Sequence, residues 1–248
     1  MMAIRLVIFD ALHTLLKPRR PIYVQYSQTF EPYLGVLEPE ALKSSFKTAL
    51  KQLQTEKPVY QSGAQEWWGE VIRRTAIGAG ADQEVVDKSL GEIVPRLLHR
   101  FASREGYKLF DDSLPTLQRL KSMSVHTAVI SNTDVRMQAV IEDLGLLPYI
   151  DTALLSEEEG IEKPSREIFL RACSRVGVSM HEALHVGDEL AADYFGAKQS
   201  GLSALLLRRP GPEGEGEMKE ANEDLRDIEV VPDLLHVVDR VNNANERC

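Results

Sequence analysis

Residues 6–10 read LVIFD, and residues 11–15 continue as ALHTL. Four apolar residues followed by a carboxylate are typical of a strand that is buried on both faces of a parallel sheet. In open sheets of this kind, ligands bind beyond the carboxyl ends of the strands. We therefore expect Asp10 to lie at a strand end where its carboxylate can reach a ligand.

Two further segments carry groups suited to an anion. An apolar run ends in Ser131 and Asn132, and Lys163 stands before a proline and a helical segment. A hydroxyl or an amide can hydrogen-bond phosphate oxygens, and an ammonium group neutralises negative charge. These residues predict a phosphate-binding site.

Carboxylates follow another apolar run. Asp188 comes directly after residues 183–187, which read ALHVG, and Asp193 lies five residues further along the chain. Carboxylate oxygens are preferred ligands of magnesium, and carboxylates crowded together without a cation repel one another. With Asp10 they predict a magnesium site, in which either Glu189 or Asp193 completes the set.

In this order and spacing, the segments resemble the four motifs of the haloacid dehalogenase superfamily, over roughly 4–16 and 110–240. The resemblance implies an α/β fold with a Rossmann-like core, a parallel sheet and a helical cap. It also implies Mg²⁺ as cofactor and a small phosphorylated substrate. The site residues that it implies are catalytic Asp10 and Lys163, metal-binding Asp10, Leu12, Asp188 and Asp193, and phosphate-binding Ser131, Asn132 and Lys163.

The first motif of that superfamily is Asp-x-Asp-x-Thr, and this chain has Leu12 where the second Asp belongs. The phosphatases of the family use that second Asp as general acid and base. The backbone carbonyl of Leu12 can still bind a metal, because that role needs no particular side chain. His13 is adjacent, but neighbouring side chains in a tight loop point in different directions, so it is not a simple replacement.

Alternating helical and short apolar segments from residue 114 onward predict a parallel sheet. We assign residues 1–16 and 106–248 to this core. Residues 17–105 have helical periodicity and form the expected helical cap. Its aromatic residues, together with Leu12, are candidates for an apolar substrate pocket: Tyr23, Tyr26, Phe30, Trp67 and Trp68.

Composition narrows the function classes. The chain has 248 residues, 43% of them hydrophobic, and a net charge of −9, which argues against a nucleic-acid partner. No apolar stretch is long enough to span a membrane, and the N-terminus does not read as a signal peptide. Two cysteines, Cys173 and Cys248, fit a reduced compartment. We expect a cytoplasmic protein; nothing in the sequence predicts its oligomeric state.

A retained metal site without a general acid suits a leaving group that is itself a magnesium-bound anion. By this combination and its aromatic cap, the chain resembles the fungal haloacid dehalogenase-like terpene synthases. That resemblance implies a lyase that ionises a prenyl diphosphate such as farnesyl diphosphate. The alternatives are a hydrolase of the superfamily, either a phosphatase or a 2-haloacid dehalogenase, and a non-catalytic protein that binds a phosphorylated ligand.

Overall fold

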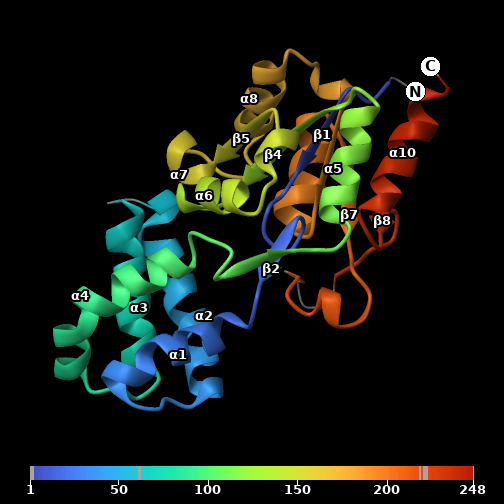
Figure 1. Ribbon diagram of the computed structural model, residues 1–248. Helices are drawn as coiled ribbons and strands as arrows, with labels where there is room; N and C mark the ends of the chain where they lie inside the picture. The colour runs from blue at the N-terminus through green and yellow to red at the C-terminus, as the bar shows by residue number, and fades with distance from the viewer. Residues whose placement is uncertain (1–2, 61–62, 218, 220–222, 248) are drawn as a thin grey trace. The chain divides into compact units, whose positions relative to one another are not determined.

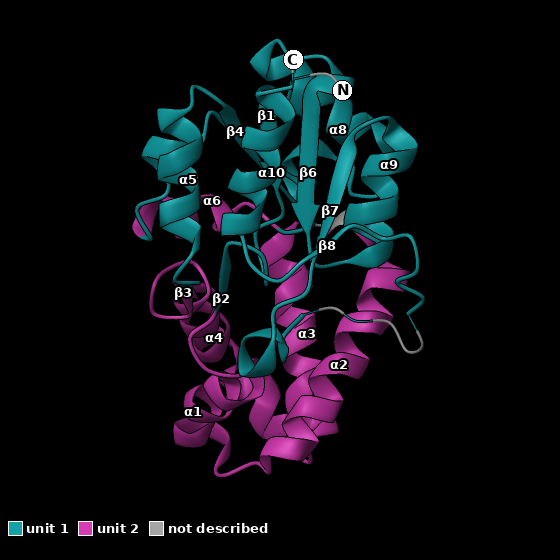
Figure 2. Ribbon diagram, turned by 90° about the vertical axis from the view of Figure 1, so that its right-hand side faces the viewer, with its two compact units in different colours: residues 1–17, 109–133, 144–248 teal, residues 18–108, 134–143 magenta. Residues whose placement is uncertain are grey.

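The structure is a computed structural model that describes residues 3–60, 63–217, 219 and 223–247. The chain divides into two compact units (Figure 2). Unit 1 comprises residues 1–17, 109–133 and 144–248, and unit 2 comprises residues 18–108 and 134–143. Cys248 lies outside the described residues.

Unit 1 is built on a parallel sheet of six strands in the order β5-β4-β1-β6-β7-β8 (Figure 1). Its strands are β1 (Leu6–Phe9), β4 (His126–Ser131), β5 (Thr152–Leu155), β6 (Ala183–Gly187), β7 (Ser203–Leu207) and β8 (Val230–Val231). The expected α/β fold with a parallel sheet is therefore confirmed. Most strand residues are apolar and buried, as expected for strands with covered faces.

The register of β1 decides which residues meet at the carboxyl edge of the sheet. Phe9 pairs with Val129 of β4 on one side and with Val186 of β6 on the other. Asp10 follows Phe9 directly, so the residues that end β4 and β6 lie beside it. These are the segments that carry Ser131 and Asp188.

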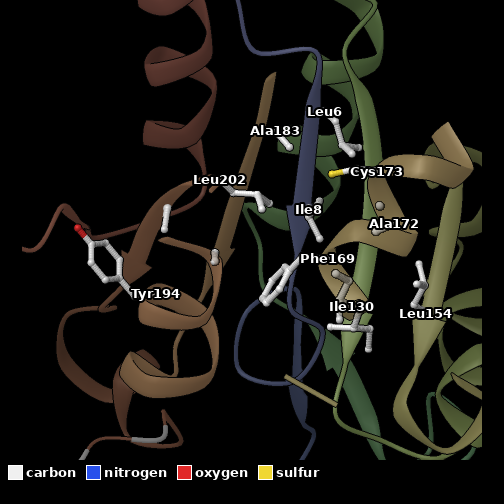
Figure 3. Close-up of a cluster of buried hydrophobic side chains, with 14 of the residues drawn as sticks. Leu6, Ile8, Ile130, Leu154, Phe169, Ala172, Cys173, Ala183, Tyr194 and Leu202 are labelled. Atoms are coloured by element: carbon white, nitrogen blue, oxygen red, sulfur yellow. The ribbon is translucent and has the colours of Figure 1, made fainter. Parts of the chain in front are cut away.

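Helices pack against this sheet. They are α5 (Ser113–Ser122), α7 (Ser156–Glu159), α8 (Arg166–Val176), α9 (Gly196–Ser200) and α10 (Leu235–Asn245). Figure 3 shows how Phe169 and Cys173 of α8 meet Leu6 and Ile8 of β1 in one buried cluster. Leu6 and Ile8 are two residues apart and so share one face of the sheet.

Unit 2 is helical. It contains α1 (Ile22–Leu34), α2 (Pro39–Glu56), α3 (Ala64–Gly78), α4 (Gln83–Arg100) and α6 (Arg136–Asp143). Helix α4 begins after Asp82, whose side chain accepts a hydrogen bond from the backbone N–H of Val85 at 3.1 Å. Apolar side chains from α1 to α4 form a core of their own.

Helix α6 belongs to unit 2 although it lies beyond residue 108 in sequence. The Trp68 indole N–H donates to Asp134 at 2.7 Å, and the Arg104 guanidinium pairs with Asp143 at 2.9 Å. The two strands β2 (Leu16–Pro18) and β3 (Tyr107–Leu109) form a second small sheet where the chain passes between the units. The assignment of 17–105 as a cap stays a prediction. Within the described residues, no helix has the length and apolar character required to cross a bilayer.

Candidate active site

Asp10 is held by the strand that precedes it and by the turn that follows. Its backbone N–H donates to the Val186 carbonyl at 2.9 Å, which extends the sheet pairing by one residue. The Ala11 carbonyl then accepts from Leu15 and Leu16, at 2.9 and 3.0 Å, and closes a tight turn. The carboxylate of Asp10 is buried, with 7% of the residue exposed.

Lys163 lies between two carboxylates. Its Nζ is 2.6 Å from Oδ1 of Asp10 and 2.6 Å from Oδ1 of Asp193, and the Lys163 side chain is buried. Burial alone would lower the pKa of Lys163, but the two carboxylates raise it above its usual value, so the ammonium stays charged. This ammonium therefore connects Asp10, which follows β1, to Asp193, which lies beyond the end of β6.

The two carboxylates that flank Lys163 differ in pKa. Burial raises the pKa of Asp10 to about 7 against the opposing charge of Lys163, and the Asp193 carboxylate adds to the rise. Burial would also raise the pKa of Asp193, but Lys163 and a hydrogen bond from His185 hold it well below its usual range. Asp193 is therefore the firmly ionised partner of Lys163.

Every oxygen of Asp193 has a protein partner. Oδ1 accepts from Lys163 and from Nε2 of His185, the latter at 2.9 Å, and Oδ2 accepts from the backbone N–H of Glu189 at 2.9 Å. The carboxylate lies against Gly187, where an added Cβ would fall 2.1 Å from Cγ of Asp193. Only glycine fits at that position, which explains the Gly-Asp sequence before the turn.

Asp188 completes a group of three buried acids. One oxygen from each of Asp10, Asp188 and Asp193 lies within 4.8 Å of the others. With one Lys163 ammonium, three ionised carboxylates leave two negative charges, which match a divalent cation. The donor set therefore fits magnesium. Both carboxylate oxygens of Asp193 accept hydrogen bonds from the protein, and metal binding by Asp10, Leu12, Asp188 and Asp193 stays a prediction.

Ser131 and Asn132 reach this edge of the sheet from β4. The Asn132 amide donates to the Lys163 carbonyl at 2.9 Å and accepts from the Lys163 N–H at 2.8 Å, so it fixes the backbone that carries the lysine. The buried Ser131 hydroxyl accepts from the Thr133 hydroxyl at 3.1 Å. Phosphate binding by Ser131, Asn132 and Lys163 stays a prediction.

The turn at Leu12 and His13 carries no charged side chain. Leu12 is partly buried and bridges to Leu16, and His13 has a φ of 63°. Burial lowers the pKa of His13 to about 4, so its imidazole is neutral at physiological pH. Gly216 lies against the ring, since an added Cβ there would be 2.6 Å from it.

Several residues around the site were not singled out from the sequence. The Thr14 hydroxyl donates to Asp188 at 3.4 Å, and the Thr14 carbonyl accepts from Arg209 at 3.0 Å. Arg208 donates to the Asp188 carbonyl, and His185 supports Asp193. The sequence carries a signal for the histidine and the arginines. His185 is a lone histidine inside an apolar strand, and Arg208 and Arg209 come directly after another apolar strand.

The five aromatic residues expected in a substrate pocket all lie in unit 2. Tyr26 and Phe30 are buried in the core formed with α4, and Trp67 is buried in a smaller cluster with Leu53 and Val71. Tyr23 is partly buried, and Trp68 is partly buried with its N–H bonded to Asp134. Most of their surface therefore packs within unit 2, and a role in substrate binding stays a prediction.

Comparison with known proteins identifies hydrolases. A family model described as haloacid dehalogenase-like hydrolase matches residues 4–201. Haloacid dehalogenase-like hydrolase domain-containing protein 3 of Danio rerio is 31% identical over 211 residues, which are 83% of this chain and 86% of that protein. Both matches agree with the superfamily resemblance seen in the motifs.

Solved structures share the fold. The 2-haloacid dehalogenase of Pseudomonas syringae pv. Tomato DC3000 has a TM-score of 0.64 and 25% identity, over 97% of this chain and 98% of that one. A HAD phosphatase of Thermococcus onnurineus has a TM-score of 0.58 and 20% identity, over 97% and 98%.

These findings correct the expected activity. The prediction of a terpene synthase, a lyase acting on a prenyl diphosphate, is wrong, because the family model and the relative are described as hydrolases. The error came from treating the leucine at position 12 as evidence for a carbocation reaction. The loss of one acid removes a proton donor and says nothing about a prenyl substrate. The alternative of a superfamily hydrolase is the better interpretation.

Proposed function

Because the chain belongs to the haloacid dehalogenase-like hydrolases, we propose that it is a magnesium-dependent hydrolase of phosphate esters, with Asp10 as the nucleophile. The observation that carries this proposal is the buried group of Asp10, Asp188 and Asp193 around a single Lys163. Three acids with one ammonium call for a divalent cation, and a metal-free reaction would gain nothing from them.

In this proposal, Asp10, Asp188 and the carbonyl of Leu12 hold Mg²⁺, and Asp193 positions Lys163. Bound magnesium supplies charge neutralisation for the phosphoryl oxygens and for Asp10. The Lys163 ammonium, whose Nζ lies 2.6 Å from Oδ1 of Asp10, also neutralises negative charge there. The Ser131 hydroxyl and the Lys163 ammonium are the groups proposed to hydrogen-bond the transferred phosphoryl group.

The proposed first step forms a bond between a carboxylate oxygen of Asp10 and phosphorus, while the bond from phosphorus to the leaving oxygen breaks. The electron pair of that broken bond goes to the leaving oxygen. Water then attacks the phosphorus of the aspartyl phosphate and the bond from phosphorus to Asp10 breaks, which regenerates the Asp10 carboxylate and releases inorganic phosphate that keeps both protons of the water. The first step needs Asp10 ionised, the second acts on the phosphorylated Asp10, and both need Lys163 charged.

The missing acid restricts the substrates. Leu12 cannot protonate a leaving alkoxide, and His13 is partly buried and neutral at physiological pH. A leaving group that is stable as an anion needs no proton donor. We therefore propose that aryl and acyl phosphates, whose leaving groups are weak bases, are better substrates than alkyl phosphates.

The test compares p-nitrophenyl phosphate and acetyl phosphate with glycerol phosphate, in magnesium and after chelation. Magnesium-dependent release of phosphate from the first two, and much slower release from the third, supports the proposal. Asp10→Asn and Asp188→Asn should each abolish it while the circular dichroism spectrum is unchanged.

A second candidate is a 2-haloacid dehalogenase, and the leucine at position 12 favours it because a departing halide needs no proton. The test is halide release from 2-chloropropionate after a chelator has removed divalent metal ions. Halide release under this condition, together with no phosphatase activity in magnesium, would establish the dehalogenase and exclude the phosphatase. The acidic group favours the phosphatase, since Asp188 and Asp193 would repel a substrate carboxylate if no metal neutralised them.

A further inference from the structure

Unit 2 contains a small cavity of its own, with a volume of about 40 Å³. Aliphatic and aromatic side chains from α1, α2, α3 and α4 form most of its wall. Four lining residues carry polar groups: Tyr26, Trp68, Tyr107 and Arg136. A cavity with such mixed walls differs from a packing defect, which in a helical core is apolar.

Asp134 orients the arginine. The guanidinium of Arg136 donates from Nε to Oδ1 of Asp134 at 2.8 Å and from Nη2 to Oδ2 at 2.6 Å. The Trp68 N–H donates to the same Oδ2 at 2.7 Å, and the guanidinium lies 5.1 Å from the centre of the Trp68 ring. This bidentate contact leaves Nη1 directed away from Asp134, and among the described residues nothing accepts a hydrogen bond from it.

Two phenol groups stand close to this arginine. Tyr26 is buried, with 2% of its surface exposed, and Tyr107 is partly buried. Burial raises the pKa of Tyr107 to about 12 and that of Tyr26 still further, while the charge of Arg136 acts on both in the opposite direction. Both hydroxyls are therefore neutral and can donate hydrogen bonds, and both lie close enough to Arg136 for its charge to affect their pKa. Neither has a hydrogen-bond partner among the residues that the structure describes.

We propose that this cavity binds the carboxylate group of a small organic acid. Arg136, Tyr26 and Tyr107 line this one cavity, and the Nη1 of Arg136 and the two phenol hydroxyls are donors to which no described residue offers an acceptor. A carboxylate offers the acceptors they lack, and the aromatic and aliphatic wall suits the short carbon body of such an acid.

Size and charge narrow the ligand class. A volume of about 40 Å³ corresponds to roughly three water-sized spheres at 10–15 Å³ each, which fits a carboxylate and a short carbon chain. Asp134 cancels the net charge of Arg136, so a dianion such as phosphate would meet too little positive charge. A singly charged carboxylate, which would accept a hydrogen bond from Nη1 of Arg136, is the better match. None of these residues takes part in the reaction proposed for unit 1.

Trp68 provides a reporter for the test. The chain has two tryptophans, and Trp67→Phe leaves the one that lines the cavity. Sodium propionate should change the Trp68 emission along a saturating curve, whereas propionamide and sodium chloride at the same ionic strength should not. Calorimetric titration of the unaltered chain with propionate gives a second measure that does not require the variant to fold.

The variants identify the site. Tyr107→Phe removes one donor and should weaken propionate binding about tenfold, since a hydrogen bond to a charged group contributes that much or more. Tyr33→Phe is the matched control, because Tyr33 lies outside the cavity lining and bonds Glu92 at 3.0 Å. Absence of saturable binding in both titrations, or equal binding of propionate and propionamide, would overturn the proposal and leave a cavity that holds water only. An equal effect of both tyrosine variants would also overturn it.

Discussion

Two groups of buried charged residues differ in their balance. In unit 1, Asp10, Asp188 and Asp193 face one ammonium, that of Lys163. In unit 2, Asp134 faces Arg136 in a bidentate pair. The first group has an excess of negative charge that a cation must offset, whereas the second is neutral by itself. We take the excess negative charge in unit 1 as the mark of the proposed metal site, and the neutral pair in unit 2 as the feature that orients the Arg136 donors in the proposed cavity site.

The largest expected effect comes from removing the nucleophile in the unbalanced group. Asp10→Asn should lower hydrolysis of p-nitrophenyl phosphate at least about 10⁴-fold, because loss of a nucleophile removes the covalent route altogether. Initial rates with saturating magnesium measure this. Asp87→Asn, which alters an exposed acid of unit 2, is the control and should keep the wild-type rate. A small loss in Asp10→Asn would mean that another group attacks phosphorus.

The next effect is a gain. Leu12→Asp should raise the hydrolysis of an alkyl phosphate such as glycerol phosphate by about 10²–10⁴-fold, the usual contribution of a general acid. The increase should be smaller for p-nitrophenyl phosphate, whose leaving group needs no proton and which gains only from base catalysis of the second step. Leu12→Asn, which has similar size but no acidic proton, should give no gain. Fast glycerol phosphate hydrolysis by the unaltered chain would instead show that a proton donor is already present.

The balanced pair should matter for stability and not for the chemistry. Asp134→Asn leaves the Arg136 charge without its partner and should cost about 3 kcal/mol of unfolding free energy, the lower end for a buried pair because Arg136 keeps one-fifth of its side chain exposed. Burial alone would raise the pKa of Asp134, but Arg136 holds it below its usual value. The stabilisation is therefore present above the unfolded-state pKa and is lost as pH falls through the folded-state value. Urea unfolding at pH 7 and at acidic pH measures the difference, which should shrink in acid.

The smallest effect is metal linkage in the unbalanced group. Magnesium at 100 times its dissociation constant should raise the unfolding free energy by about 2.7 kcal/mol, and a chelator should remove that gain. Thermal unfolding with and without magnesium measures it. Asp188→Asn should abolish the shift, whereas Asp134→Asn should retain it in full. A shift that disappears in both variants would mean that the two groups are not independent.

The sequence located the strand ends well, because apolar runs and the polar residues that follow them are local features. Asp10, Asp188 and Asp193 were expected together, and the structure brings their carboxylates within 4.8 Å. The contact that Asn132 makes with Lys163 could not be predicted, because the partner is distant in sequence. Asn132 clamps a backbone 31 residues away. The two-residue strand β8 carries too little pattern to be recognised.

The misjudged activity has the same physical origin as the missed contacts. A leucine at position 12 indicates that a general acid is missing there, but it carries no information about which substrate the protein binds. The aromatic residues of unit 2 were similarly ambiguous, since Tyr26, Phe30 and Trp67 are needed for its own cores. The Asp134–Arg136 pair escaped notice because a charged pair two residues apart is common on surfaces, and only burial beside Trp68 sets it apart.

The discontinuity of unit 2 has a consequence for genetic engineering. Its helix α6 comes from residues 134–143, after the chain has returned to unit 1 for residues 109–133. A gene segment coding for residues 18–108 would therefore omit Asp134 and Arg136, and with them the arginine that lines the cavity and the acid that orients it. Grafting this helical unit onto a relative would require both segments to be exchanged together. Shuffling at the obvious insertion boundaries would yield chimeras whose helical unit contains an α6 from the other parent.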